Sequence, residues 1–171
     1  MVELPCRTIR YHQINDLVWR ALRRADTPSI KEPSGLLPGE DKRLDGLTLV
    51  PWQGGRCLAW DATVVDTLAP YYVAVSAQVT GSAAQAAAEK KVSKYAGLPA
   101  SHLFVPIAIE TLGPINEAGH SFMAELGWRL STISDDRRES FFLFQRISIL
   151  IQRFKEVAFR GTFDVETGHN E

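Results

Sequence analysis

Two aspartates stand inside apolar, strand-like runs in residues 42–65, KRLDGLTLVPWQGGRCLAWDATVV. Asp45 lies in the first run and Asp61 in the second, and a Gly-Gly pair separates the two runs. Burying a carboxylate among apolar side chains costs free energy unless a hydrogen bond or a cation compensates it. The chemistry that these residue types suggest is the binding of a shared cation.

The two runs predict a β-hairpin that turns at the sequence QGG. Side chains alternate between the faces of a strand, and opposed side chains on antiparallel neighbours lie about 5 Å apart. Two carboxylates at that separation repel each other unless a divalent cation lies between them. Oxygen ligands of this kind suit Mg²⁺ or Mn²⁺. An alternative stays open, in which one aspartate caps a turn and the other forms a salt bridge.

A helix predicted over residues 82–96, SAAQAAAEKKVSKYA, follows the hairpin and ends at Gly97. On a helical projection centred on Ala88, Lys91 lies at the edge of the apolar stripe, next to Tyr95 one turn later. A lysine there, facing a sheet with two carboxylates, is placed to polarise a water molecule or to stabilise charge on a phosphoryl group. The alternative is a lysine that extends its ammonium group into solvent.

Further elements are needed to position these residues. The helix predicted over 82–96 lies between the second hairpin strand and a later predicted strand. This order indicates a β-α-β unit on a mixed sheet, so we expect an α/β fold. Pro51 is expected to end the first hairpin strand because it has no N–H to donate. The other expected elements are a helix over 14–25, a short strand over 30–32, a buried strand in HLFVPIAIET, a helix over 117–130 and a helix over 136–160 that stops at Gly161.

The composition suits one domain with a buried core, since the 171 residues are 45% hydrophobic and 23% charged. No apolar run is long enough to span a membrane, the N-terminus does not resemble a signal peptide, and two cysteines make no disulfide framework. These features favour an intracellular protein that does not enter membranes. The net charge is −1, but positive charge gathers near both ends of the sequence, and such local patches can hold phosphate.

The motifs KEPSG, KRLDG, WDATVV and KKVSKY, with the opening IRYHQIND, resemble the PD-(D/E)XK or restriction-like nuclease superfamily. The likeness is closest to the C-terminal endonuclease domain of site-specific non-LTR retrotransposons and covers about residues 7–113. It implies a restriction-endonuclease-like core of a helix, a mixed central sheet with a hairpin, a crossover helix and a strand. Residues 117–161 would be a C-terminal helical extension and 164–171 a frayed tail of a single domain spanning 1–171.

The resemblance implies a metal-dependent DNA endonuclease, with Asp45 and Asp61 as ligands of Mg²⁺ or Mn²⁺. The backbone carbonyl of Ala62 would join them. Lys91, or Lys94 in its place, would be the catalytic lysine. In the parent elements such a nick primes reverse transcription, so a reverse transcriptase domain is an expected partner alongside DNA, with a nuclear location if the target is chromosomal.

The resemblance also implies residues around the reaction centre. Glu32 in KEP would be an accessory acid beside the site, and Arg10 and His12 match the arginine–histidine motif of the family. We count these last two among candidate nucleic-acid contacts, together with Tyr95.

Arginines recur every seven residues along the last predicted helix. Arg146 and Arg153 lie on one side of it, a ridge that can follow a phosphate backbone. A solvated polar face explains the same pattern, and this alternative stays open.

Two positions depart from the family pattern. Leu44 stands where the family has a proline, and Thr63 stands where the wider superfamily keeps a strand lysine. The second departure is expected for the retrotransposon branch, in which the lysine has moved to the following helix. Leu44 favours the alternative of a decayed nuclease fold that acts as a DNA-binding or scaffold module. Retention of Asp45, Asp61 and Lys91 together favours the enzyme.

Overall fold

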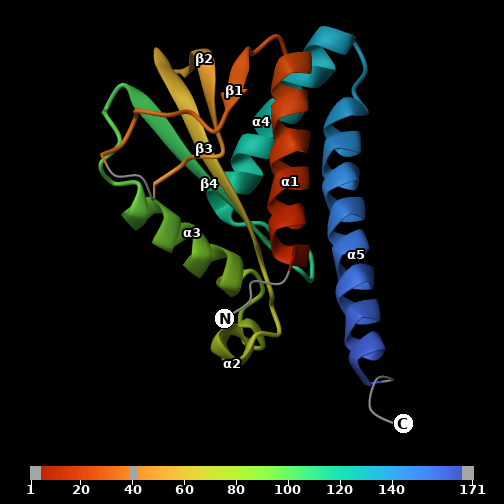
Figure 1. Cartoon of the computed structure of the whole chain (residues 1–171). Coiled ribbons are helices and arrows are strands. Elements are labelled where there is room, and N and C mark those ends of the chain that lie inside the picture. Colours follow the sequence, from red (N-terminus) through yellow and green to blue (C-terminus); the bar gives the residue numbers. More distant parts are fainter. Residues whose placement is uncertain (1–4, 39–41, 167–171) are drawn as a thin grey trace.

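The computed structural model describes the backbone of residues 5–38 and 42–166, and the side chains of 12–38 and 42–156. Within these residues the chain is an α/β fold of five helices and four strands (Figure 1). The elements are α1 Pro5–Arg24, β1 Ser29–Lys31, β2 Gly46–Gln53, β3 Arg56–Val65, α2 Pro70–Ser76, α3 Ser82–Lys94, β4 His102–Glu110, α4 Glu117–Ser134 and α5 Glu139–Glu166.

The four strands form one mixed sheet in the order β1-β2-β3-β4. The first two pairs are antiparallel, and β3 pairs with β4 in parallel. Helix α3 lies in the connection between those parallel strands, which is the crossover that a β-α-β unit requires. The predicted α/β class, the hairpin and the β-α-β unit are therefore confirmed.

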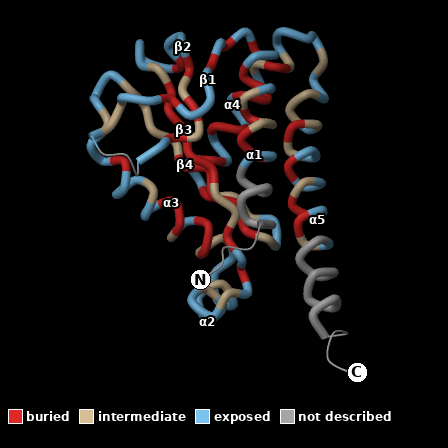
Figure 2. The backbone as a smooth tube through the Cα atoms, in the orientation of Figure 1, coloured by how far each residue is buried: buried red, intermediate tan, exposed pale blue. Residues whose placement is uncertain are grey.

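Helices cover both faces of this sheet (Figure 1). On one face α1, α4 and α5 pack around Trp60, Ile107 and Leu126 in the main hydrophobic core. On the other face α3 presents alanines to Val65 and Ala108. Figure 2 shows burial concentrated on β3, β4 and the inward sides of the helices. The helices that follow residue 113 therefore pack into the main core and do not stand apart from it.

Some element boundaries differ from the expectations. Helix α1 begins at Pro5 and not near residue 14, since proline is tolerated in the first turn of a helix. Helix α5 continues past Gly161 to Glu166, so the expected stop is wrong, because a glycine inside a helix costs only about 1 kcal/mol. The short helix α2, which has no buried residue, was not predicted. The expected tail at 164–171 overlaps the end of α5, and its last five residues lie outside the described part of the chain.

The expectation that Pro51 ends its strand is also wrong. Strand β2 continues through Pro51 to Gln53, and its pairing with β3 is irregular on both sides of the proline. A bulge accommodates a residue that cannot donate a ladder hydrogen bond. Across the described residues, no helix combines the length and the apolar character that a membrane crossing needs.

Candidate active site

The hairpin places Asp45 and Asp61 opposite each other. Gly46 pairs with Trp60, so the residue before Gly46 faces the residue after Trp60. Asp45 donates its N–H to the carbonyl of Trp60 at 3.0 Å, and its Oδ2 accepts the N–H of Ala62 at 2.6 Å. The two carboxyl groups lie close enough for the protonated form of Asp45 to hydrogen bond to Asp61. The structure thus brings the two predicted residues together.

The electrostatics of this acidic pair are unfavourable in the protein alone. The pKa of Asp45 is raised from 3.8 to about 7, first by burial and then by the charge of Asp61. A hydrogen bond between the two side chains adds to the rise, while the N–H of Ala62 and the charge of Lys91 oppose it. Burial and a neighbouring carboxylate therefore favour the protonated form of Asp45 in the protein alone.

Lys91 supplies the positive charge nearest to the pair. Its Nζ lies 2.5 Å from Oδ2 of Asp61, and the Lys91 side chain is 26% exposed. Lys94 is exposed, lies over the ring of Tyr95 at 5.0 Å from the ring centroid, and forms no ion pair with a described residue. Of the two candidate lysines, only Lys91 is therefore at the acids in this structure.

The orientation of α3 differs from the expected one. Val92 is half exposed, and the buried residues of the helix are Ala83, Ala84, Ala87 and Ala88. The buried face is thus turned toward Ala87, and Lys91 lies near its centre and not at its edge. A lysine at the centre of the face points at the sheet, where the acids lie.

Asp61 keeps an unused acceptor. Its Oδ2 is buried and, beyond the ion pair with Lys91, accepts no hydrogen bond from the described residues. Buried carboxylate oxygens without donors are rare in folded proteins. Together with Asp45 this oxygen offers the hard donors that Mg²⁺ or Mn²⁺ prefers. No group of three or more His, Cys, Asp or Glu side chains suited to a metal occurs in the described part of the chain. A metal ion held by this pair would need oxygens from water or substrate to complete its coordination shell.

Asn15 on α1 holds both strands of the hairpin at the acids. Its Nδ2 donates to the carbonyl of Asp45 at 3.1 Å, and its Oδ1 accepts from Trp60 Nε1 at 2.9 Å. Asn15 is buried, so both bonds form away from water. The sequence analysis missed this residue as part of the site. The available signal was a polar side chain among the buried residues Ile14 and Val18 of the same helix.

Trp60 also explains why a glycine, Gly46, follows Asp45. A Cβ atom built on Gly46 would lie 1.9 Å from Cζ2 of Trp60. The ring thus packs directly on the backbone next to the first acid, and any larger residue would displace it.

Tyr95 and Leu44 form the wall behind the acids with Ala59. The Tyr95 hydroxyl donates to the carbonyl of Arg43 at 2.6 Å, and burial, then the charges of Asp61 and Asp45, raise the pKa of Tyr95. Tyr95 is buried, which does not fit its expected contact with nucleic acid. Leu44 is buried in the same cluster, so an apolar side chain in the place of the family's proline has a packing role here.

The remaining candidates lie outside the acidic pair. Glu32 donates its backbone N–H to the carbonyl of Asp45 at 3.0 Å, but its side chain is exposed. His12, Arg146 and Arg153 are exposed and line a groove between α1 and α5. The side chain of Arg10 lies outside the described residues.

Another buried carboxylate, which sequence reasoning did not single out, lies at the end of β4. Glu110 accepts the N–H of Ala84 at 3.0 Å with Oε1 and the hydroxyl of Thr67 at 3.3 Å with Oε2. Ala84 is in the first turn of α3, whose N–H groups have no partner within the helix. Glu110 therefore caps α3 and ties it to the sheet.

Comparison with known proteins adds no family to these observations. No protein family model and no curated protein matches the chain. A function is therefore inferred from the geometry of Asp45, Asp61 and Lys91.

Proposed function

We propose that this chain is a metal-dependent endonuclease domain that hydrolyses phosphodiester bonds and nicks DNA. One observation carries the proposal: the carboxyl groups of half-buried Asp45 and buried Asp61 lie within hydrogen-bonding reach of each other, with Lys91 Nζ 2.5 Å from Asp61. A protein gains no stability from two like charges held this close, whereas a cation and an anionic substrate make use of them.

The side chains have distinct roles in this proposal. Asp45, Asp61 and the carbonyl of Ala62 would hold Mg²⁺ or Mn²⁺, which lowers the pKa of a bound water and offsets phosphate charge. Lys91 would leave its ion pair with Asp61 and donate a hydrogen bond to the attacking water or to a phosphate oxygen. Tyr95 and Leu44 close the apolar side of the site and keep bulk water from the acids.

The resemblance to restriction-like nucleases supports the same reaction. In the retrotransposon branch the first aspartate follows an Arg/Lys-Pro pair, the second lies on the next strand, and the lysine comes from the following helix. Asp45 lies directly before β2, Asp61 on β3 and Lys91 on α3, in that order. A retrotransposon origin, a reverse transcriptase partner domain and a nuclear place of action belong to this proposal.

A second candidate function is a decayed nuclease fold that binds DNA or serves as a scaffold. It is favoured by the ion pair itself, because Lys91 already neutralises Asp61 without a metal. The two functions differ in one measurable property, which is hydrolysis in the presence of Mg²⁺.

Nicking of a supercoiled plasmid tests the proposal. With Mg²⁺ or Mn²⁺ the wild-type protein is expected to nick, and EDTA to stop it. Asp61→Asn and Lys91→Met are each expected to lower the rate about 100-fold or more, the size of effect seen when one charge-stabilising group is removed. Lys94→Met is the matched control and should stay within about 2-fold. Equal nicking by wild type and Asp61→Asn would overturn the enzyme; plasmid binding without nicking would favour the second candidate.

A further inference from the structure

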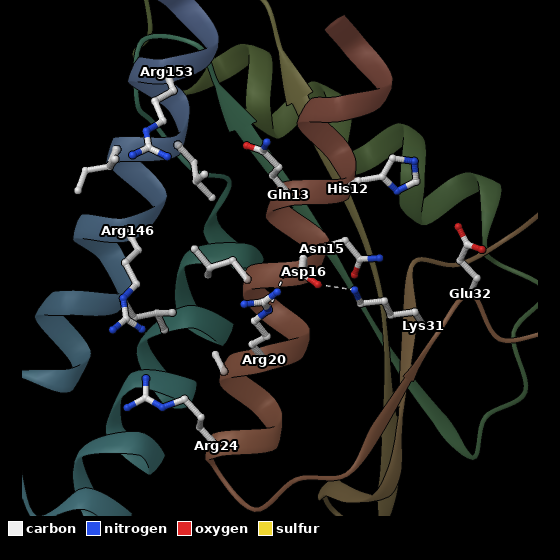
Figure 3. Close-up of a pocket in the computed structure, with 15 residues that line it drawn as sticks. His12, Gln13, Asn15, Asp16, Arg20, Arg24, Lys31, Glu32, Arg146 and Arg153 are labelled. Carbon is white, nitrogen blue, oxygen red and sulfur yellow. Dashed lines mark hydrogen bonds and ion pairs between the residues drawn. The ribbon is translucent and has the colours of Figure 1, made fainter. Parts of the chain in front are cut away.

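A groove of about 850 Å³ lies between α1 and α5 (Figure 3). Two acidic side chains, Asp16 and Glu32, also line it. The five cationic residues that line it come from both helices and from β1: Arg20, Arg24, Lys31, Arg146 and Arg153. Since the whole chain has a net charge of −1, this excess of positive charge is a property of the groove and not of the composition.

The positive charge is only partly neutralised within the protein. Arg20 and Lys31 share Asp16, at 2.6 and 2.5 Å, and Arg24 pairs with Glu139 at 2.6 Å. Arg146 and Arg153 are exposed and form no ion pair with a described residue. These two arginines of α5 therefore leave positive charge that an anion in the groove can neutralise.

The shape of the groove indicates which part of a nucleic acid it fits. Arg146 and Arg153 are seven residues apart on α5, which is about 10 Å along the axis. Phosphates of one DNA strand follow each other every 3.4 Å or so along the duplex axis, so these arginines match phosphates about three nucleotides apart. No Trp, Tyr or Phe occurs among the described lining residues, so the groove has no surface on which bases stack.

The lining of the groove reaches the backbone of the first acid. Asn15 and Glu32 line it, and both donate hydrogen bonds to the carbonyl of Asp45, at 3.1 and 3.0 Å. Figure 3 shows His12 and Glu32 on the side of α1 away from Arg146 and Arg153. Asn15 and Glu32 therefore connect the lining of the groove to the backbone of Asp45, whereas the carboxylate of Asp61 faces α3 on the other side of the sheet.

We propose that the groove binds the sugar–phosphate backbone of the DNA substrate outside the site of hydrolysis, without reading its sequence. The identity of the bound anion as substrate rests on the proposed function. Binding itself requires neither a metal nor hydrolysis, because phosphate contacts by arginine position a duplex independently of the chemistry.

The test measures the affinity for a fluorescent DNA duplex by anisotropy, in EDTA and over a range of salt. Arg146→Gln with Arg153→Gln is compared with Arg56→Gln with Arg137→Gln, which removes equal charge from exposed positions outside the groove. We expect the groove variant to bind at least 10-fold more weakly and to lose about 1.8 from the slope of log K against log salt, which is about 0.9 for each phosphate contact. The control variant should keep the wild-type slope, and melting curves confirm that both variants fold.

Three results would overturn the proposal. The first is an equal loss of affinity in both double variants, the second is no DNA binding by the wild type, and the third is equally tight binding of polyglutamate with the same dependence on Arg146 and Arg153. The failure of the proposed function is separable from these. If Asp61→Asn nicks like the wild type but the groove variant still loses affinity, the groove binds DNA and the acidic pair is not its active site. Mg²⁺-dependent hydrolysis of bis(4-nitrophenyl) phosphate, too small to fill the groove, should be unchanged in the groove variant.

Discussion

Helix α3 contacts buried carboxylates at both of its ends, and the two sites differ in how completely the protein satisfies them. Both oxygens of Glu110 receive a donor, one from the first turn of α3 and one from Thr67. At the other end Asp45 and Asp61 repel each other, and Oδ2 of Asp61 has Lys91 but no hydrogen bond from a described residue. A carboxylate whose bonds are complete stabilises a fold, while one left incomplete offers its oxygens to a ligand.

The direction of the helix strengthens this contrast. The N-terminus of a helix carries partial positive charge and stabilises an anion such as Glu110. Lys91 and Lys94 lie in the last turn, where cations are favoured. One sheet therefore carries a structural carboxylate, Glu110, and a candidate catalytic pair, Asp45 and Asp61. Substitutions at these residues test whether the two sites differ in this way.

The largest effect on stability is expected at Glu110, whose carboxylate oxygens both accept hydrogen bonds. Glu110→Ala leaves the N–H of Ala84 and the hydroxyl of Thr67 buried without an acceptor, at about 1–3 kcal/mol for each unsatisfied group. We expect a loss of about 3 kcal/mol in the free energy of unfolding, measured by urea denaturation. Glu110→Gln keeps one acceptor and should lose less. A loss below about 1 kcal/mol in Glu110→Ala would mean that Glu110 does not hold α3.

A smaller effect on stability, of opposite sign, is expected when Asp45 of the acidic pair is replaced. The pKa of Asp45 is about 7 in the folded protein against 3.8 ordinarily, so the unfolded chain ionises first as the pH rises. The contribution of Asp45 to stability is therefore full below about pH 4, falls up to about pH 7 and is level above. Asp45→Asn keeps an acceptor for the N–H of Ala62 and removes the charge.

Thermal or urea unfolding without metal checks this. Asp45→Asn should be more stable than the wild type by about 2 kcal/mol at pH 8, since each unit of pKa difference corresponds to 1.36 kcal/mol and coupling with Asp61 reduces the total. The difference should vanish below about pH 4. The same variant should lose nicking. A variant less stable than the wild type at pH 8 would place Asp45 with Glu110 as a structural carboxylate.

The smallest effect on stability is expected at Asn15, which holds the backbone of Asp45. Asn15→Ala removes the hydrogen bonds to Asp45 and Trp60 and should cost about 1.5 kcal/mol. Its specific signature is a higher Mg²⁺ concentration for half-maximal nicking, because the first acid is held less firmly. Val18→Ala, in the same helix and fully buried, is the control that destabilises by a similar amount without touching the acids. An equal Mg²⁺ dependence in both variants would reduce Asn15 to a core residue.

The parts of the site that the sequence predicts are those set by short-range geometry. The turn at Gly54 and Gly55 joins the two runs closely, but the register that sets Asp45 opposite Asp61 also depends on the irregular pairing around Pro51, which the sequence does not predict. Lys91 follows from helical spacing, although its place at the centre of the face depends on alanines that allow α3 to lie close to the sheet.

The parts that the sequence does not predict depend on contacts between distant elements. Asn15 is 30 residues from Asp45 and 45 from Trp60, and Tyr95 is 52 from Arg43. Hydrogen-bond partners so far apart in the sequence depend on how the helices pack on the sheet. Local sequence patterns do not specify that packing. The end of α5 differs from the expectation because a helix tolerates one glycine at a cost of only about 1 kcal/mol.

The parallel pairing of β3 with β4 has a consequence for the order in which the protein is made. Helix α3 packs against both strands, and its first turn is capped by Glu110, the last residue of β4. A nascent chain that has emerged only as far as α3 contains Asp45, Asp61 and Lys91 but lacks the strand and the cap that fix this helix in place. The lysine therefore reaches the acids only after β4 is translated, because a parallel pair forms only when its crossover connection is closed.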